Sequence, residues 1–124
     1  MEELKEIRTQ KWKVHKFGGT SVLNAERYRN VYEILMNFPT NELSRELSGQ
    51  APKAVVVSAM KGVTDDLIKC TEMAQQQNEA YKNLLVQIHQ RHTSEVSLLL
   101  TDQILKEGLL AVLKKDFSEL AEIL

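Results

Sequence analysis

The sequence predicts an α/β fold: the N-terminal part of a larger α/β domain with parallel strands, followed by a largely helical C-terminal stretch. Three observations carry this prediction. A strand-like segment at residues 12–17 precedes a glycine pair and a helical pattern. A continuous apolar run, Ala54–Val57, follows soon after a proline, and such runs are typical of parallel strands buried on both faces. From Glu79 to Leu124 the chain has no proline and a single glycine, which favours helices.

The first strand is expected at Trp12–Phe17, where aromatic, β-branched and basic residues mix. A helix is expected to begin at Ala25, because Asn24 is of the type preferred as an N-cap. It should end near Phe38, since the proline that follows disfavours helical geometry in the residue before it. One face of this helix is apolar, and it comprises Tyr28, Val31, Tyr32, Leu35 and Phe38.

The next part of the chain leads from a polar connection to a second helix. Thr40–Pro52 is expected to be this connection, with one short helical turn around Asn41–Leu47. After the apolar strand, a helix is expected from about Thr64, because Asp65 and Asp66 favour the positive end of a helix dipole. Its buried stripe comprises Val63, Leu67, Cys70 and Ala74. The strand–helix–strand order predicts a parallel pair with a right-handed crossover, and two strands are few for a sheet.

The C-terminal third is expected to form two helices with a break within Leu99–Gln103. Each helix has one apolar face: Leu84, Leu85, Ile88 and His92 in the first, and Leu109, Leu113, Phe117, Leu120 and Leu124 in the second. The three leucines at 98–100 are consecutive and cannot all face one core. The lysine, arginine and glutamate residues of both helices are interpreted as solvated faces.

The composition is that of an ordinary globular chain. Its 43% hydrophobic and 27% charged residues fit neither a disordered protein nor a membrane-spanning one. A formal net charge of −1 removes the electrostatic reason to expect nucleic acid as a partner. The acidic N-terminus lacks the apolar region of a signal peptide, so a cytoplasmic protein without membrane contact is expected.

Few residues suit a disulfide or a metal. The single cysteine, Cys70, cannot form an internal disulfide and is interpreted as a small core residue. His89 and His92 have a helical spacing that could hold a metal ion, but no third ligand lies near them in the sequence. Contacts between helices are the preferred interpretation for both. His15 is interpreted as a strand residue that faces a helix, and no metal site is predicted.

The first candidate loop, residues 16–22, follows the first strand at the end where ligands of open α/β sheets bind. Gly18 and Gly19 allow positive φ angles and a close approach, so that successive N–H groups can face phosphate oxygens. Lys16 supplies a cation for a phosphoryl group in transit. The lysine precedes the glycines, so this is not a Walker loop. The alternative is a plain glycine turn between strand and helix.

The second candidate loop, residues 58–66, follows the second strand. It offers the hydroxyls of Ser58 and Thr64, a glycine and a helix N-terminus, which together suit an anion or a carboxylate. The alternative is structural: Thr64 would serve as an N-cap, and the acidic residues after it would only interact with the helix dipole.

Together the two loops resemble those of the aspartokinases, within the amino acid kinase family. The matching segments are Lys16-Phe17-Gly18-Gly19-Thr20-Ser21-Val22 and, forty positions later, Val56-Val57-Ser58-Ala59-Met60 with Gly62-Val63-Thr64. The resemblance is strongest over residues 13–68. It implies the carbamate-kinase-like three-layer sandwich of that family. Residues 1–124 would then form the N-terminal portion of the catalytic domain, without the nucleotide-binding half and the regulatory domains.

The resemblance also implies a reaction and a set of site residues. Aspartokinases transfer the γ-phosphoryl group of ATP, bound with Mg²⁺, to the side-chain carboxylate of L-aspartate. The product is 4-phospho-L-aspartate, on the route to lysine, threonine and methionine. The lysine that matches Lys16 is catalytic in the family, and the nucleotide-binding set comprises Lys16, Phe17, Gly18, Gly19, Thr20 and Ser21. Ser58 and Thr64 match positions of the aspartate site.

The chain departs from the family pattern in one respect: no Gly-Glu dipeptide occurs, whereas a family Gly-Glu loop binds the amino group of aspartate. The 124 residues alone are therefore expected to be inactive, to hold no tightly bound cofactor and to form a homo-oligomer. Fusion to a homoserine dehydrogenase is not decided by the sequence. Two other functions stay open: a small helical interaction module, and an amino acid kinase for another carboxylate such as acetylglutamate.

Overall fold

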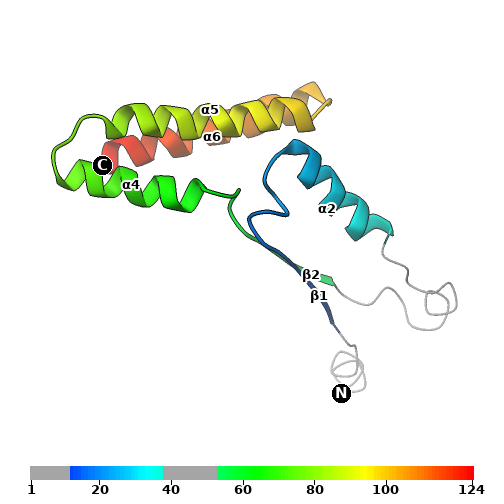
Figure 1. Ribbon diagram of the computed structural model, residues 1–124. Helices are drawn as coiled ribbons and strands as arrows, with labels where there is room; N and C mark the ends of the chain where they lie inside the picture. Colours follow the sequence, from blue (N-terminus) through cyan, green and yellow to red (C-terminus); the bar gives the residue numbers. More distant parts are fainter. Residues whose placement is uncertain (1–11, 38–52) are drawn as a thin grey trace, which may run out of the picture.

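A computed structural model of the chain describes residues 12–37 and 53–124. Its elements are β1 (Lys13–Phe17), α2 (Ala25–Asn37), β2 (Lys53–Val57), α4 (Val63–Gln75), α5 (Tyr81–Leu99) and α6 (Gln103–Ile123). The helices α4, α5 and α6 lie along one another, and the strands extend away from them beside α2 (Figure 1). The predicted turn at 41–47 and the end of the first apolar face at Phe38 lie outside the described residues.

The two strands form a parallel sheet, as the sequence predicts. Their register pairs Lys13 with Lys53 at one end and Phe17 with Val57 at the other. The burial of β2 on both faces, which the sequence predicts for a larger domain, is not found within the described residues, where Val55, Val56 and Val57 are 43%, 51% and 47% exposed. Among the described elements, the helices pack against one another rather than across the sheet. The mixed α/β class is thus confirmed, whereas the three-layer sandwich stays a prediction.

Helix α5 is the centre of the helical part, and it packs against α2, α4 and α6 (Figure 1). The predicted break between the last two helices is confirmed, since α5 ends at Leu99 and α6 begins at Gln103. Asp102 fixes this boundary, because its Oδ1 accepts a hydrogen bond from the Leu105 N–H at 3.0 Å. Leu98 is 62% exposed, in agreement with the expectation that the three leucines do not share one core.

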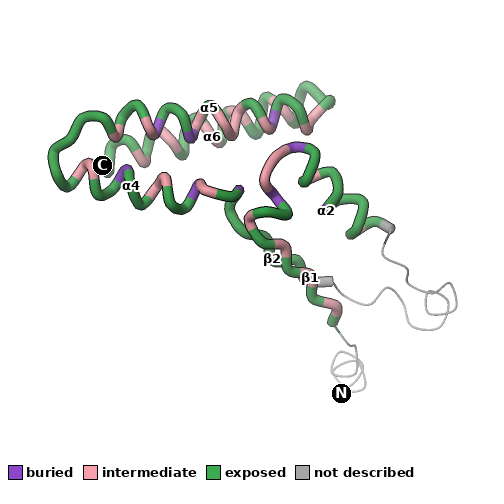
Figure 2. The backbone as a smooth tube through the Cα atoms, in the orientation of Figure 1, coloured by how far each residue is buried: buried purple, intermediate pink, exposed green. Residues whose placement is uncertain are grey.

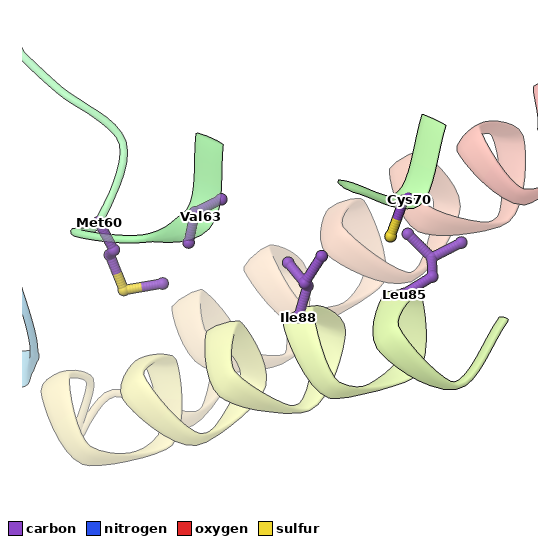
Figure 3. Close-up of a cluster of buried hydrophobic side chains, with 5 residues drawn as sticks. All are labelled: Met60, Val63, Cys70, Leu85 and Ile88. Carbon is purple, nitrogen blue, oxygen red and sulfur yellow. The ribbon is translucent and has the colours of Figure 1, made fainter. Parts of the chain in front are cut away.

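The main core cluster lies between α4 and α5. It comprises Met60, Val63, Cys70, Leu85 and Ile88, with the last two on α5 (Figure 3). Phe117 and Leu120 of α6 and Leu124 just after it pack against this cluster, which confirms the C-terminal part of the predicted apolar face, whereas Leu109 of the same face is 42% exposed. The Cys70 side chain is fully buried, as expected for a small core residue.

Helix α2 begins as predicted. The Asn24 Oδ1 accepts a hydrogen bond from the Arg27 N–H at 3.0 Å, which is the geometry of an N-cap. Its apolar face is narrower than the sequence suggests, because Val31 is buried while Tyr32 is 63% exposed. Helix α5 contacts this face, and the described part of the chain has no other helix packed on it.

The histidines of α5 make contacts between helices, as predicted. The rings of His89 and His92 lie 4.7 Å and 5.5 Å from the Phe117 ring of α6, centroid to centroid. The Nδ1 of His92 lies 2.7 Å from the Ile88 carbonyl oxygen. Within residues 12–37 and 53–124, no three or more His, Cys, Asp or Glu side chains are grouped so that they could hold a metal ion. The described helices include none that is long and apolar enough to span a bilayer.

Candidate functional site

The two candidate loops begin side by side at the carboxyl ends of the parallel strands. The N–H of Ser58 donates to the Phe17 carbonyl at 3.0 Å, which extends the parallel pairing one residue beyond β2. This bond sets the start of the second loop directly beside the glycine pair. The structure therefore brings the two segments together at the sheet edge where α/β proteins bind ligands.

The glycine loop makes its closest approach to the second loop at Gly19. A Cβ atom on Gly19 would lie 3.3 Å from the Ala59 carbonyl oxygen and 3.3 Å from the Lys61 Cα, so a larger residue would push the two backbones apart. Gly18 has open space around it instead. Neither glycine uses the positive φ angles that its missing side chain allows. The N–H of Ser21 donates to the Gly18 carbonyl at 2.9 Å, which closes an ordinary turn without left-handed backbone.

The strand alternation places Lys16 on the more open face of β1. Lys13, His15 and Phe17 are half-buried, while Val14 and Lys16 between them are exposed. The ring of His15 lies parallel to the ring of Phe17, with 6.4 Å between centroids. Phe17 of the same strand is thus one ring neighbour of His15. The Lys16 ammonium is thus presented to solvent just before the loop.

The side chains of Lys16, Thr20, Ser21, Ser58 and Thr64 are exposed and have no hydrogen-bond or ion-pair partner within the described part of the chain. The second loop also carries the charged residues Lys61, Asp65 and Asp66. Between them the two loops therefore offer a ligand two ammonium groups and four hydroxyls, beside two carboxylates at the start of α4.

Gly62, rather than Thr64, is the N-cap of α4. It has a φ of 89°, and no side chain caps the helix at this end. The interpretation of Thr64 as an N-cap is therefore wrong, because the helix begins at Val63, whose N–H donates to the Met60 carbonyl at 3.0 Å. Thr64 lies in the first helical turn, where N–H groups have no carbonyl of their own helix to bind. Its side chain is exposed.

Two residues of α5 contact the loops, and sequence reasoning missed both. Arg91 donates from Nη1 to the Lys61 carbonyl at 2.9 Å and from Nη2 to the Leu23 carbonyl at 3.1 Å. The Glu95 carboxylate accepts a hydrogen bond from the Ala25 N–H at 2.5 Å. The charged residues of α5 had been assigned to a solvated face, which is wrong for these two. An arginine and a glutamate four residues apart give the same pattern on any exposed helix, so the sequence holds no signal for this role.

Comparison with known proteins gives a consistent family. A bifunctional aspartokinase/homoserine dehydrogenase from Arabidopsis thaliana is 38% identical over 81 residues, or 65% of this chain. A bifunctional aspartokinase/homoserine dehydrogenase from Zea mays is 34% identical over 113 residues, or 91% of this chain. The chain belongs to the aspartokinase family. The matched segments are 8% and 11% of the length of these relatives, so this aspartokinase sequence spans about a tenth of them.

The relatives are named as chloroplastic enzymes with two activities, and those names describe the relatives. No model of a protein family matches this aspartokinase segment. The identification thus agrees with the resemblance of the two loops, and the similarity to the Zea mays protein extends over most of the chain.

Proposed function

We propose that this chain is the N-terminal portion of an aspartokinase catalytic domain. The whole protein would transfer the γ-phosphoryl group of ATP to the side-chain carboxylate of L-aspartate, giving 4-phospho-L-aspartate and ADP. One observation carries the proposal: the Gly19 backbone packs on Ala59–Lys61, so that the two loops, which carry an exposed lysine and four hydroxyls, lie side by side at the carboxyl end of a parallel sheet. A purely structural glycine turn needs the close approach but not those unpartnered groups.

The chemistry suits residues of this type. A carboxylate is already a nucleophile at neutral pH, so the reaction needs positioning and charge stabilisation rather than a strong base. Lys16 would stabilise the negative charge on the transferring phosphoryl group. Phe17 and the glycine turn with Thr20 and Ser21 would contact the nucleotide phosphates, while Ser58 and Thr64 would bind aspartate.

The magnesium ion would arrive with ATP as part of the substrate. Within the described residues, no three or more His, Cys, Asp or Glu side chains are grouped to hold a metal ion. The ammonium groups of Lys16 and Lys61 and the hydroxyls of the loops fit phosphate oxygens and a carboxylate, and the loops also carry the carboxylates of Asp65 and Asp66. In this proposal the chain therefore contacts the anionic parts of the substrates, and Mg²⁺ neutralises the nucleotide phosphates when it is bound.

A specific observation also favours a protein-contact role for α6. Ile104, Leu105 and Ile123 are 82%, 62% and 80% exposed, which is unusual for large apolar side chains on a helix. We propose that these residues belong to contacts within a homo-oligomer of the whole protein. An interaction module without kinase chemistry would share this surface, but it would give Lys16 no ligand.

The experiment that tests the kinase proposal compares two lysine variants of the full-length protein. In a coupled assay of aspartate-dependent ADP release, Lys16→Ala should lower kcat by about 10²- to 10³-fold and change the KM for aspartate much less. Lys69→Ala, which removes an exposed lysine of α4 away from both loops, is the matched control and should be near normal. Near-normal kcat in Lys16→Ala with only a raised KM would show that the catalytic assignment is wrong.

The substrate and the cellular location of the full-length protein can each be tested. Activity with acetylglutamate in place of aspartate would identify a different amino acid kinase. A cytoplasmic location, predicted from the sequence, stays a prediction, because the named relatives are chloroplastic enzymes. Fluorescence of a full-length fusion confined to plastids would contradict it.

A further inference from the structure

Arg91 joins the two candidate loops to each other through one guanidinium group. Its two terminal nitrogens donate to carbonyls that are 38 residues apart in the chain: Leu23, at the end of the first loop, and Lys61, in the second. Charge-assisted hydrogen bonds of this kind are stronger than neutral ones. The planar guanidinium holds its donors in a fixed fork, so the spacing of the two carbonyls is fixed with it.

Glu95 holds the same region from the next turn of α5. Its carboxylate accepts from the N–H of Ala25, the first residue of α2, at 2.5 Å. This N–H is one of the groups that a helix N-terminus leaves without an internal partner. Arg91 and Glu95 are four residues apart, so they lie on one face of α5 and hold consecutive points of the segment that leaves the glycine loop.

The surroundings of the two side chains are partly closed. Arg91 and Glu95 are half-buried, and so are Leu23 and Tyr28 beside them. Burial raises the pKa of the Tyr28 phenol, the Glu95 carboxylate adds to the rise, and Arg91 opposes it. Tyr28 is therefore close enough to sense both charges. The opposite charges lie together in a place where solvent screens them less than on an open surface.

We propose that Arg91 and Glu95 are positioning residues of the aspartokinase site: from α5 they fix the separation of the glycine loop and the second loop, and so align Lys16 with the aspartate-binding hydroxyls. Neither residue touches a substrate in this inference. The effect on turnover rests on the proposed function, whereas the effect on loop order does not. A misplacement of about 1 Å can lower the rate of a positioned reaction by about 10²-fold, so small loop shifts are measurable.

The chain offers a matched control in a second arginine that bonds to a backbone carbonyl. Arg29 of α2 also donates from its guanidinium to a backbone carbonyl of α5, that of Leu98. This bond ties α2 to the far end of α5 and touches neither loop. Arg29→Ala and Arg91→Ala therefore remove the same kind of hydrogen bond, once away from the loops and once between them.

Amide hydrogen exchange of the 124-residue chain tests the positioning directly. Arg91→Ala should speed exchange in residues 18–24 and 58–62 by about tenfold or more, with α6 unchanged, whereas Arg29→Ala should leave the loops unchanged. Arg91→Lys, which keeps the charge but lacks the fork, should give an intermediate result and guards against a variant that does not fold. Unchanged loops in Arg91→Ala, or equal acceleration in every helix, would overturn the proposal.

Kinetics of the full-length protein test the second half of the inference. Arg91→Ala should lower kcat for aspartate-dependent ADP release by about 10- to 100-fold, and Arg91→Lys should recover part of the loss. An unchanged kcat together with faster loop exchange would overturn the link to catalysis. If Lys16→Ala were also normal, the fault would lie with the proposed function instead, and the exchange data would still judge the loop positioning.

Discussion

The helices and the sheet of this chain differ in how far they bury their apolar residues. The core cluster is built by α4 and α5 with Met60 just before them, and α6 packs against it. No described residue of either strand is buried; Val14 is 66% and Val56 51% exposed. Figure 2 shows the same contrast, with buried positions along α4 and α5 and none along the strands. Stability and the candidate chemistry thus lie in different parts of the molecule.

This difference indicates what keeps the site in order. The loops follow a sheet that gains little stability from hydrophobic burial. Their placement therefore depends on specific contacts between the loops and with the helical part. Those contacts are the fit of Gly19 on the second loop, the left-handed Gly62 that starts α4, and the hydrogen bonds of Arg91 and Glu95. A stable helical part can therefore coexist with a site that a single substitution disturbs.

The largest expected effect is the loss of a core side chain from α5. Ile88 is 3% exposed, and Ile88→Ala should lower the free energy of unfolding by about 2–5 kcal/mol through lost burial and a residual cavity. Urea unfolding of the 124-residue chain, followed by circular dichroism, measures this change.

Two matched substitutions sharpen the contrast. Ile104→Ala removes the same atoms from a side chain that is 82% exposed, and it should change stability by less than about 0.5 kcal/mol. Val56→Ala in the half-exposed sheet should cost less than about 1 kcal/mol. If Val56→Ala were as costly as Ile88→Ala, the sheet would be as firmly packed as the helices, and the comparison would be wrong.

Alanine substitutions of Gly62 and Gly108, two glycines of the helical part, should give the next largest effects on stability, and the two effects should have opposite signs. Gly62→Ala should destabilise the chain by about 1–2 kcal/mol, because a φ of 89° is unfavourable for a residue with a Cβ. The nearest atom to that Cβ, the Arg91 Nη1 at 3.9 Å, leaves enough room, so the backbone angle is the cause.

Gly108→Ala should instead stabilise the chain by about 0.5–1 kcal/mol. It lies inside α6 with open space around it, where alanine is the better helix former. Thermal unfolding of both variants measures the two shifts. A Gly62→Ala chain as stable as the parent would show that α4 does not need its left-handed start.

Much of the helical part could be predicted because local rules decide it. The Asn24 cap, the break after Leu99 and the stripe with Cys70 follow from side-chain type and helical spacing, and all three are confirmed. The meeting of the two loops could also be predicted, since parallel strands end at the same edge of a sheet.

The rest depends on three-dimensional neighbours that a local pattern does not contain. The Ala54–Val57 run has the composition of a buried strand, yet in the described part of the chain no helix packs across it. Arg91 and Glu95 bind loop atoms some 30 to 70 residues away. Gly62 takes the left-handed backbone that the glycine pair also allows, because the turn that starts α4 needs it and the turn after β1 does not.

A smaller effect is expected from the hydroxyl of the second loop. In the full-length protein, Thr64→Val should raise the KM for aspartate by about 3- to 10-fold, the equivalent of one lost hydrogen bond of about 0.5–1.5 kcal/mol. The KM for ATP should change little, because Thr64 lies on the aspartate side in the proposed arrangement. Initial rates with each substrate varied in turn provide both constants.

The same substitution about two turns further along α4 is the control. The Thr71 hydroxyl donates to the Leu67 carbonyl within the helix at 3.1 Å, so Thr71→Val should leave both KM values unchanged. Since Gly62 is the N-cap, Thr64→Val should not reduce stability either. If Thr64→Val raised the KM for ATP as much as the KM for aspartate, the assignment of Thr64 to the aspartate site would be wrong.

The smallest expected effect is an alkaline loss of stability that begins in the helical core. Burial raises the pKa of the Cys70 thiol, and the Asp66 carboxylate adds to the rise, from an ordinary value of 9.0. The folded chain therefore holds this proton more tightly than the unfolded chain. The resulting stability is fully present below pH 9.0 and is lost as the pH rises through the higher pKa of the folded thiol.

The Tyr28 phenol, whose pKa is also raised from an ordinary value of 10.0, should contribute only at higher pH. Urea unfolding between pH 8 and 10 measures the first step, and Cys70→Ala should remove it while lowering stability at every pH through the lost packing. Because Cys70 and Tyr28 both lie outside the strands, Val56→Ala should keep the full pH dependence. A Cys70→Ala chain with the same pH dependence as the parent would place the titrating group outside the helical core.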